Sequence, residues 1–434
     1  MRKIFILAVV LLVAALAILS FSRKRTGTLA QLAQLVQSNK PRVSAPQVPK
    51  TDAEKLVADN NAFAFSLYQR LREDDSNLIF SPYSISTALA MTYAGARGET
   101  EKQMAKALHF GLPQDRLHSA FNSLDHEFAS RDKDEDGQPY KDFKLLTANS
   151  LWGQKGYTFL PQFTDLLAEN YGAGMRLVDY TEDAEGARKA INDWVSKQTQ
   201  GKIEDLIKPG GLSSEMKLVL VNAIYFKDQW ETSFNEKFTK PDHFTLLDGS
   251  KIMTEMMSQR DYFGYAQGKG YQAAKLPYLW SKFDMMILLP DKNKFREFES
   301  ALDATRLIEI SRQLTVREID LTMPKFKFET SMGLVDTLSE MGMPLVFQYG
   351  PADLSGMDGT RELFLSAVLH KAMIAVDEEG TEAAAATYVV PSTDWDDPPP
   401  VIPKMIIDRP FIFLIRDTKT DAILFLGRVL NPKG

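Results

Sequence analysis

The 434-residue sequence contains no cysteine. This absence excludes disulfide bonds, thiolate zinc sites and cysteine nucleophiles. It leaves the redox compartment open, because an exported protein does not need disulfides. The sequence also has no Asn-x-Ser/Thr acceptor site for N-glycosylation. Since a heavily glycosylated eukaryotic secretory protein usually carries such a site, we expect a bacterial source.

The motifs of common enzyme classes are also missing. There is no Gly-x-Ser-x-Gly motif and no Gly-x-Gly-x-x-Gly motif after a strand. The glycine-rich run 264–270 has the wrong spacing for a phosphate loop and lacks its Ser or Thr. The five histidines are scattered, and the closest pair, His118 and His126, does not have metal-ligand spacing. We therefore expect no catalytic residue, cofactor or metal, and an anchored hydrolase is the least favoured interpretation.

The sequence also lacks a strong excess of either charge, with 51 Lys and Arg against 57 Asp and Glu residues. The net charge is −6, with 44% hydrophobic and 25% charged residues, which are ordinary values for a globular protein. Nothing in this composition indicates a nucleic-acid partner. The chain is long enough to bury a sizeable core, and we expect a monomer.

The one long apolar run is at the start of the chain. Met1-Arg2-Lys3 precede an uninterrupted apolar stretch over 4–19, and basic residues follow at 23–25. This pattern indicates a signal peptide or membrane anchor over residues 1–22, without a clear cleavage site. We expect an extracytoplasmic protein that is secreted, periplasmic or anchored, with membrane contact only through residues 4–22 if they are retained.

The remaining chain divides into a polar linker and one domain. Residues 23–50 contain three prolines and are typical of a linker, and the domain spans 51–434. Apolar spacing predicts helices over 53–73 and from Ser81-Pro82 to Tyr93. Short apolar runs predict strands at 218–226, 285–289, 318–323, 411–415 and 423–426. The fold class is α+β, with large mixed or antiparallel sheets and about eight or nine helices.

One late segment has an unusual pattern. Residues 378–390 contain four consecutive alanines, which alone favour a short exposed helix. With a period of two, small side chains share each face of an extended strand, and Gly380 offers a permissive hinge. The acidic, proline-rich run 391–400 is typical of an exposed loop. The segment is therefore suited to entering a sheet as a strand.

Several motifs in the domain resemble those of the serpin family. The segment 378–387 is similar to the hinge of inhibitory serpins, and 408–413 and 425–432 resemble the family's C-terminal strands. Further similar motifs lie at 77–85, 148–152, 201–203, 222–230, 323–326 and 352–357.

The resemblance implies a serine protease inhibitor with an exposed reactive-centre loop at about 378–400. In such proteins the protease cleaves the loop, which then inserts into the main sheet while the enzyme is covalently attached. The alternative is a non-inhibitory serpin that acts as a chaperone or carrier. The resemblance assigns the hinge to Glu378, Glu379, Gly380, Thr381, Glu382, Ala383, Ala384, Ala385 and Ala386.

The loop register implied by the resemblance places the cleaved bond between Asp394 and Trp395, with Thr393 as the alternative bait residue. The loop is a few residues longer than usual, and Pro391 lacks an N–H for pairing. Asp394 favours a protease that accepts acidic residues, and cysteine proteases are a further possible target. Trp395 favours a chymotrypsin-like enzyme, and Thr393 an elastase-like one.

The resemblance also implies two groups of supporting residues. One is a hydrogen-bonded cluster that holds the sheet closed until it opens, formed by Ser81, Ser84, Asn222 and His370. The other surrounds the place where the loop enters the sheet, and consists of Lys325, Glu378 and Trp230. A satisfied core histidine, a solvated surface pair and an ordinary core tryptophan are the simpler interpretations of these residues.

Overall fold

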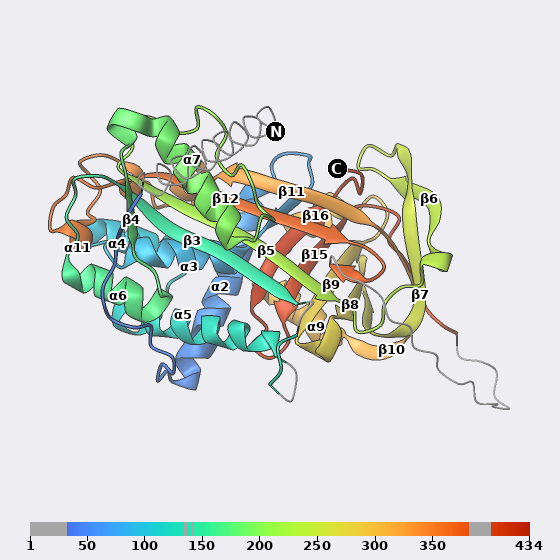
Figure 1. Cartoon of the computed structure of the whole chain (residues 1–434). Helices are drawn as coiled ribbons and strands as arrows, with labels where there is room; N and C mark the ends of the chain where they lie inside the picture. Colours follow the sequence, from blue (N-terminus) through green and yellow to red (C-terminus); the bar gives the residue numbers. More distant parts are fainter. Residues whose placement is uncertain (1–32, 134–136, 141–142, 382–400) are drawn as a thin grey trace, which may run out of the picture.

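The computed structural model describes residues 33–133, 137–140, 143–381 and 401–434. Two large sheets form the body of the molecule, and most helices lie at one end and on the faces of the sheets (Figure 1). The α-helices of this part are α2 Lys50–Leu71, α3 Pro82–Tyr93, α4 Gly98–Ala107, α5 Gln114–Ala129, α6 Pro161–Tyr171, α7 Tyr180–Gln198, α8 Phe295–Ser300, α9 Ala304–Gln313, α10 Val335–Glu340 and α11 Ser355–Asp358.

The strands divide between the two sheets. The first sheet has the order β1-β4-β3-β5-β12-β11, with β13 paired to β5. Its strands are β1 Gln34–Val36, β3 Lys144–Gln154, β4 Met175–Val178, β5 Leu218–Gln229, β11 Phe326–Gly333, β12 Leu365–Val376 and β13 Gly380–Thr381. The second sheet has the order β14-β10-β7-β8-β9-β15-β16-β2, with β6 paired to β7. Its strands are β2 Leu78–Phe80, β6 Lys240–Thr245, β7 Lys251–Gly268, β8 Tyr271–Pro277, β9 Phe283–Pro290, β10 Thr315–Pro324, β14 Lys404–Ile406, β15 Phe411–Asp417 and β16 Ile423–Val429.

Both sheets are mixed, as the sequence predicts. In the first sheet β3 pairs in parallel with β4, and β5 pairs in parallel with β12. In the second, β10 and β14 are parallel and the other pairs are antiparallel. The α+β prediction is confirmed, and the described residues contain ten α-helices, slightly more than the eight or nine expected.

Burial explains the composition of the central strand β5. Every residue from Leu218 to Phe226 is buried, because both faces of this strand are covered. On one face α7 packs through Ile191 and Val195 (Figure 1). The other face joins the main core, which extends to the second sheet. An uninterrupted apolar strand is the pattern expected for such a two-sided environment.

The start of α3 is set by a local capping interaction. The Ser81 hydroxyl oxygen accepts a hydrogen bond from the backbone N–H of Ser84, and Pro82 occupies the first helical position. Both features stabilise a helix N-terminus, because they use groups that have no partner within the helix. The predicted boundary of this helix is confirmed.

The segment before α2 differs from its prediction. Gln34–Val36 lies within the range predicted as linker, yet it forms β1 and pairs antiparallel with β4 at the edge of the first sheet. Beyond it, Ser38 donates a 2.5 Å hydrogen bond to Asp165, and Arg42 pairs with Asp125 at 2.7 Å. A three-residue strand is too short to show a period, so the sequence could not reveal it.

No helix within the described ranges is long and apolar enough to cross a membrane. The apolar run 4–19 lies outside these ranges.

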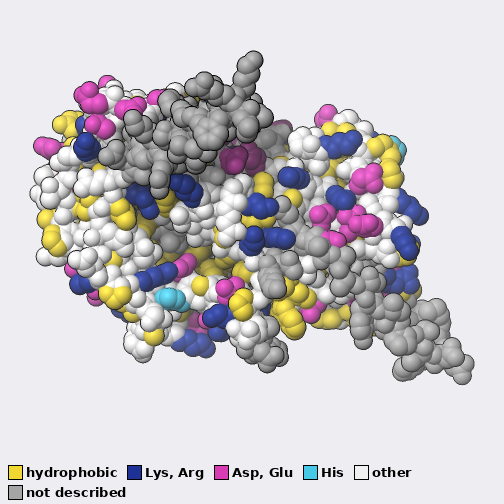
Figure 2. All heavy atoms as spheres, in the orientation of Figure 1, with side chains coloured by type: hydrophobic (Ala, Val, Ile, Leu, Met, Phe, Trp, Pro, Cys, Tyr) yellow, Lys and Arg dark blue, Asp and Glu magenta, His cyan; other side chains and the backbone are white. Residues whose placement is uncertain are grey.

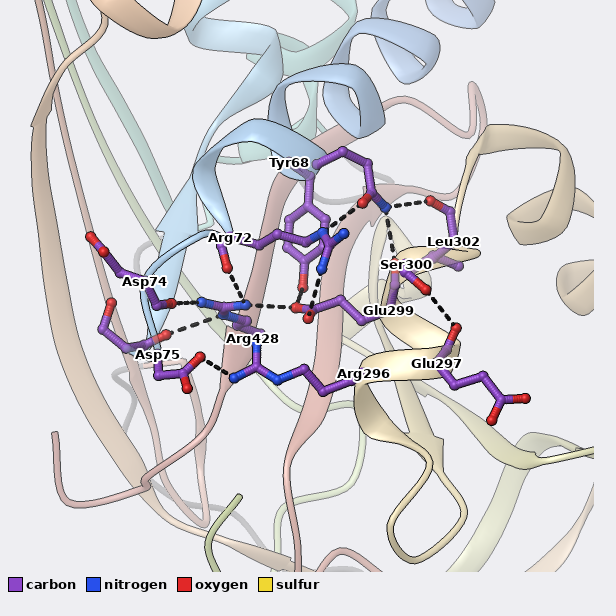
Figure 3. A network of polar contacts seen from close by, with 12 residues as sticks. Tyr68, Arg72, Asp74, Asp75, Arg296, Glu297, Glu299, Ser300, Leu302 and Arg428 are labelled. Atoms are coloured by element: carbon purple, nitrogen blue, oxygen red, sulfur yellow. Dashed lines mark hydrogen bonds and ion pairs between the residues drawn. The ribbon is translucent and has the colours of Figure 1, made fainter. Parts of the chain in front are cut away.

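A buried ionic network links α2, near the start of the domain sequence, to β16, near its end (Figure 3). Arg428 on β16 donates to Glu299 at 2.8 Å, and Tyr68 on α2 donates to the same carboxylate at 2.7 Å. Arg428 also donates to the carbonyl oxygens of Arg72 and Ser76, at 3.0 and 3.1 Å. Its guanidinium therefore satisfies backbone acceptors at and beyond the C-terminal end of α2, where intrahelical partners are missing.

We predict that Glu299→Ala lowers the free energy of unfolding by about 3–5 kcal/mol, because it leaves the buried Arg428 charge without its carboxylate. The matched control is Asp75→Ala, which removes the exposed ion pair with Arg296 at the edge of the same network. That control should lose less than about 1 kcal/mol. Denaturant unfolding measures both variants, and equal losses would contradict the prediction.

Candidate functional site: the hinge and the central strands

The structure describes the first part of the predicted hinge. Glu378, Glu379, Gly380 and Thr381 lie at the end of the first sheet where β5 and β12 separate. The remaining hinge residues, Glu382 and Ala383 to Ala386, lie outside the described residues, as do Thr393, Asp394 and Trp395.

The hinge is already joined to the sheet by its first two residues. Gly380 and Thr381 form β13, which pairs antiparallel with Gln229 and Asp228 at the end of β5. Because β5 and β12 are parallel, an antiparallel strand can continue between them and pair with both.

Gly380 is required by the close approach of the two backbones. Its φ is +153°, a value that side-chain-bearing residues rarely adopt. A Cβ at this position would lie 2.3 Å from the Asp228 carbonyl oxygen and 2.7 Å from the Gln229 Cα. Both contacts are with backbone, so no side-chain movement can relieve them.

Thr381 is buried, with 1% of its surface exposed. Its hydroxyl shares a 2.7 Å hydrogen bond with the hydroxyl of Tyr278. The Tyr278 ring stacks on Trp230 with centroids 4.6 Å apart, and the Trp230 indole N–H donates to the Asp377 carbonyl at 3.0 Å. Trp230, which the resemblance assigns to the loop-entry group, therefore packs directly beneath the hinge.

Lys325 and Glu378, which the resemblance assigns to the loop-entry group, form an ion pair with Nζ and Oε2 2.6 Å apart. Thr239 donates to the other carboxylate oxygen at 2.7 Å. Burial opposes ionisation of Glu378, but the hydrogen bonds from Lys325 and Thr239 outweigh it and lower the pKa of this carboxyl. Burial likewise disfavours the charged Lys325, yet its bond to Glu378 outweighs this and raises its pKa. The pair is therefore ionised at neutral pH.

The four residues of the predicted hydrogen-bonded cluster also lie together, within the paired part of β5 and β12. His370 on β12 faces Asn222 on β5, and the two side chains are hydrogen-bonded. The Asn222 amide N–H donates to Ser84 at 2.5 Å. The backbone N–H of Ser81 donates to His370 Nε2 at 3.3 Å. All four residues are buried, so the cluster ties β5 and β12 to the start of α3.

The protonation state of His370 follows from its partners. Nε2 accepts a hydrogen bond from a backbone N–H, so the proton is on Nδ1 and is donated to the Asn222 oxygen. Burial lowers the pKa of His370 to about 3, because no carboxylate in the described part of the chain compensates its charge. The imidazole is therefore neutral at pH 7.

The structure places in the site three residues that were not predicted from the sequence. Asn149 on β3 accepts hydrogen bonds from Ser84 and Asn222, and so extends the cluster to a third strand. Tyr278 and Thr239 support the hinge through the contacts described above. Nothing in the local sequence marks any of the three, because the strand around Asn149 also contains the polar residues Thr147 and Ser150.

The arrangement is suited to a mechanical change, the separation of β5 and β12. Among the described residues no group of three or more His, Asp or Glu side chains could hold a metal ion. The central strands are instead joined by backbone pairing between Leu218–Tyr225 and Leu365–Met373 and by the His370 cluster. Separation of these strands requires only that noncovalent bonds break.

We predict that the native state loses stability as the pH falls from about 6.5 to 3, where the unfolded histidine is protonated and the buried His370 is not. At pH 5 the loss attributable to His370 is about 2 kcal/mol. Thermal melting between pH 7 and 5 measures it, and His370→Gln should reduce the pH dependence. His243→Gln, which changes an exposed side chain, is the control; an identical pH dependence in both variants would contradict the prediction.

The chain matches the family model described as Serpin (serine protease inhibitor) over residues 58–432. It is 41% identical over 397 residues to the leukocyte elastase inhibitor of Sus scrofa and 38% identical over 392 residues to that of Homo sapiens. Each match covers 87% of this chain and 100% of the relative. These relatives are vertebrate, so they do not support the bacterial source expected from the missing glycosylation sites.

Solved structures agree with the sequence relatives. The thermophilic serpin tengpin in its native state has a TM-score of 0.79 and 28% identity, covering 91% of this chain and 97% of its own. Human thyroxine-binding globulin has a TM-score of 0.77 and 30% identity, covering 88% and 100%. Together with the family model, which matches most of the chain, these similarities establish that the chain belongs to the serpin family.

Proposed function

We propose that this protein inhibits serine proteases as a suicide substrate. The protease cleaves the loop after the hinge, the cleaved loop inserts between β5 and β12, and the acylated enzyme is carried with it. The observation that carries the proposal is the antiparallel pairing of Gly380 and Thr381 with the end of β5. This pairing already sets the direction and register that an inserting strand needs.

The composition of the following residues supports insertion. Glu382 and the four alanines continue directly from Thr381, and alanine side chains fit between the side chains of two neighbouring strands without displacing them. A new central strand pairs on both sides, whereas its insertion breaks only one existing interface. The inserted state therefore gains backbone hydrogen bonds and is the more stable one.

The target class follows from the relatives. They are named leukocyte elastase inhibitors, and Thr393 in the loop suits an elastase-like enzyme. Asp394 and Trp395 favour an acid-accepting and a chymotrypsin-like protease, respectively. We keep Asp394–Trp395 as the proposed cleaved bond.

The direct test is a covalent complex that survives denaturing electrophoresis after mixing with elastase, chymotrypsin or a Glu/Asp-specific protease. Sequencing the released C-terminal peptide identifies the cleaved bond. If every protease yields only cleaved product, inhibition is refuted. In the non-inhibitory alternative, loop cleavage leaves the melting temperature almost unchanged, whereas an inhibitor melts at a much higher temperature after cleavage.

We predict that Thr381→Arg converts the inhibitor into a substrate, because a guanidinium would have to be buried where Thr381 is 1% exposed. The matched control is Thr381→Ser, which keeps the hydroxyl that bonds Tyr278 and should still form the complex. Melting of both uncleaved variants tests whether they fold. A folded Thr381→Arg variant that still traps protease would contradict strand insertion.

The proposal gives the Lys325–Glu378 pair a gating role. The pair fixes the hinge where the loop enters the sheet, and it must rearrange as the neighbouring residues insert. We predict that Lys325→Met accelerates loop insertion after cleavage, because it removes the ionic bond while keeping the aliphatic packing. Stopped-flow fluorescence of the cleavage reaction measures the rate, and Lys327→Met on β11 is the control. An unchanged insertion rate in Lys325→Met would contradict the gating role of the Lys325–Glu378 pair.

We also propose that the protein acts outside the cytoplasm. The support is the apolar run 4–19 between basic residues. Fractionation of cells that express the full chain tests this location, and retention of the intact chain in the cytoplasm would contradict it.

A further inference from the structure

A second site lies away from the hinge, at the outer edge of the first sheet. A cavity of about 250 Å³ is lined by residues of α3, β3, α5, α6, β4, α7 and the segment that contains β1. Figure 2 shows a hollow on this face, bordered above by dark blue basic side chains. The cavity is smaller than a typical drug-sized pocket, so it suits a small ligand.

The cavity contains an arginine without a carboxylate partner. Arg176 on β4 lines it, and among the described residues its guanidinium has neither a hydrogen bond nor an ion pair. It lies instead against two indole rings, 4.9 Å from the centroid of Trp194 and 5.6 Å from that of Trp152. Burial without a compensating acid lowers the pKa of Arg176. An anion placed beside it would reverse that effect.

The other charges around the cavity do not neutralise Arg176. Arg42 and Asp125 also line the cavity, but they pair with each other at 2.7 Å. The chain that leads into β1, residues 1–32, contains no aspartate or glutamate. Among the residues that the structure describes, Arg176 is therefore the uncompensated positive charge of this cavity.

A hydrogen-bond donor is also free. The indole N–H of Trp194 is buried and has no acceptor among the described residues. Buried donors without a partner are rare in native proteins, and each is a reason to look for a missing acceptor. Leu35, Met91 and Phe121 form an apolar part of the wall, and much of the rest is polar, including Thr87, Thr147 and Gln198.

We propose that this cavity binds a small aromatic monocarboxylate. The carboxylate accepts hydrogen bonds from the planar Arg176 guanidinium and from the Trp194 indole, and the flat apolar body packs against Phe121 and Met91. Phosphate has the charge for Arg176 but no apolar body for the walls. The cavity shares no residue with the hinge, but Asn149 of the His370 cluster is among its lining residues.

Calorimetric titration of the full-length protein with phenylacetate tests the proposal. We expect a saturable dissociation constant below about 1 mM, and about tenfold weaker binding of the isosteric neutral phenylacetamide. Inorganic phosphate, which lacks the ring, should also bind at least about tenfold more weakly. Absence of binding by phenylacetate, or equal binding of any of these probes, would overturn the proposal.

Variants locate the site. Arg176→Gln should weaken phenylacetate binding about tenfold or more, and Trp194→Phe, which keeps a ring but loses the N–H, by several-fold. The matched control is Arg317→Gln, since Arg317 also lies over an aromatic ring, that of Tyr265, but on the other sheet. Its affinity should stay within about twofold. Unchanged affinity in Arg176→Gln would place the ligand elsewhere and refute the site.

Discussion

In the middle of the first sheet β5 and β12 run parallel and are hydrogen-bonded to each other from Leu218 and Leu365 to Tyr225 and Met373. Each strand's other neighbour, β3 or β11, is antiparallel to it. Among these four strands, β5 and β12 are therefore the one neighbouring pair that is parallel. A new antiparallel strand between β5 and β12 would make the strands from β3 to β11 alternate in direction. The hinge enters from the end where β5 and β12 diverge.

The polar cluster beneath this interface is stable because it is complete. Neutral amide, hydroxyl and imidazole groups in an apolar core are unfavourable only when a donor or acceptor lacks a partner. Here the hydrogen bonds run in one direction, from Ser81 N–H through His370 and Asn222 to Ser84 and Asn149. These hydrogen bonds hold β5 and β12 together at defined positions. Because none of the groups is charged, separating the two strands does not require a buried ion pair to be broken.

Local patterns predicted the elements, and the family resemblance predicted the pairing of distant residues. The apolar run of β5 and the Ser81 cap of α3 were correct because both depend on neighbours in sequence. Periodicity alone could not reveal that Tyr278 bonds Thr381, 103 residues away, because that contact depends on the register of several strands. It also could not reveal β1, whose pairing is set by the exposed edge of β4 rather than by its own sequence. The loop after Thr381 remains a prediction from the sequence.

The Arg428 network bears on the order in which the molecule is made. Arg428 donates to the carbonyl oxygen of Arg72 at the end of α2, a residue 356 positions earlier, and β16 lies between β15 and β2 in the second sheet. During synthesis α2 and β2 leave the ribosome among the first elements of the domain, but their partner leaves last. Until then the C-terminal carbonyls of α2 and one edge of β2 must be satisfied by water or by a chaperone. Contacts between residues so far apart in sequence form slowly. These backbone groups of α2 and β2 therefore stay unpaired until the final strand β16 has been synthesised and has folded.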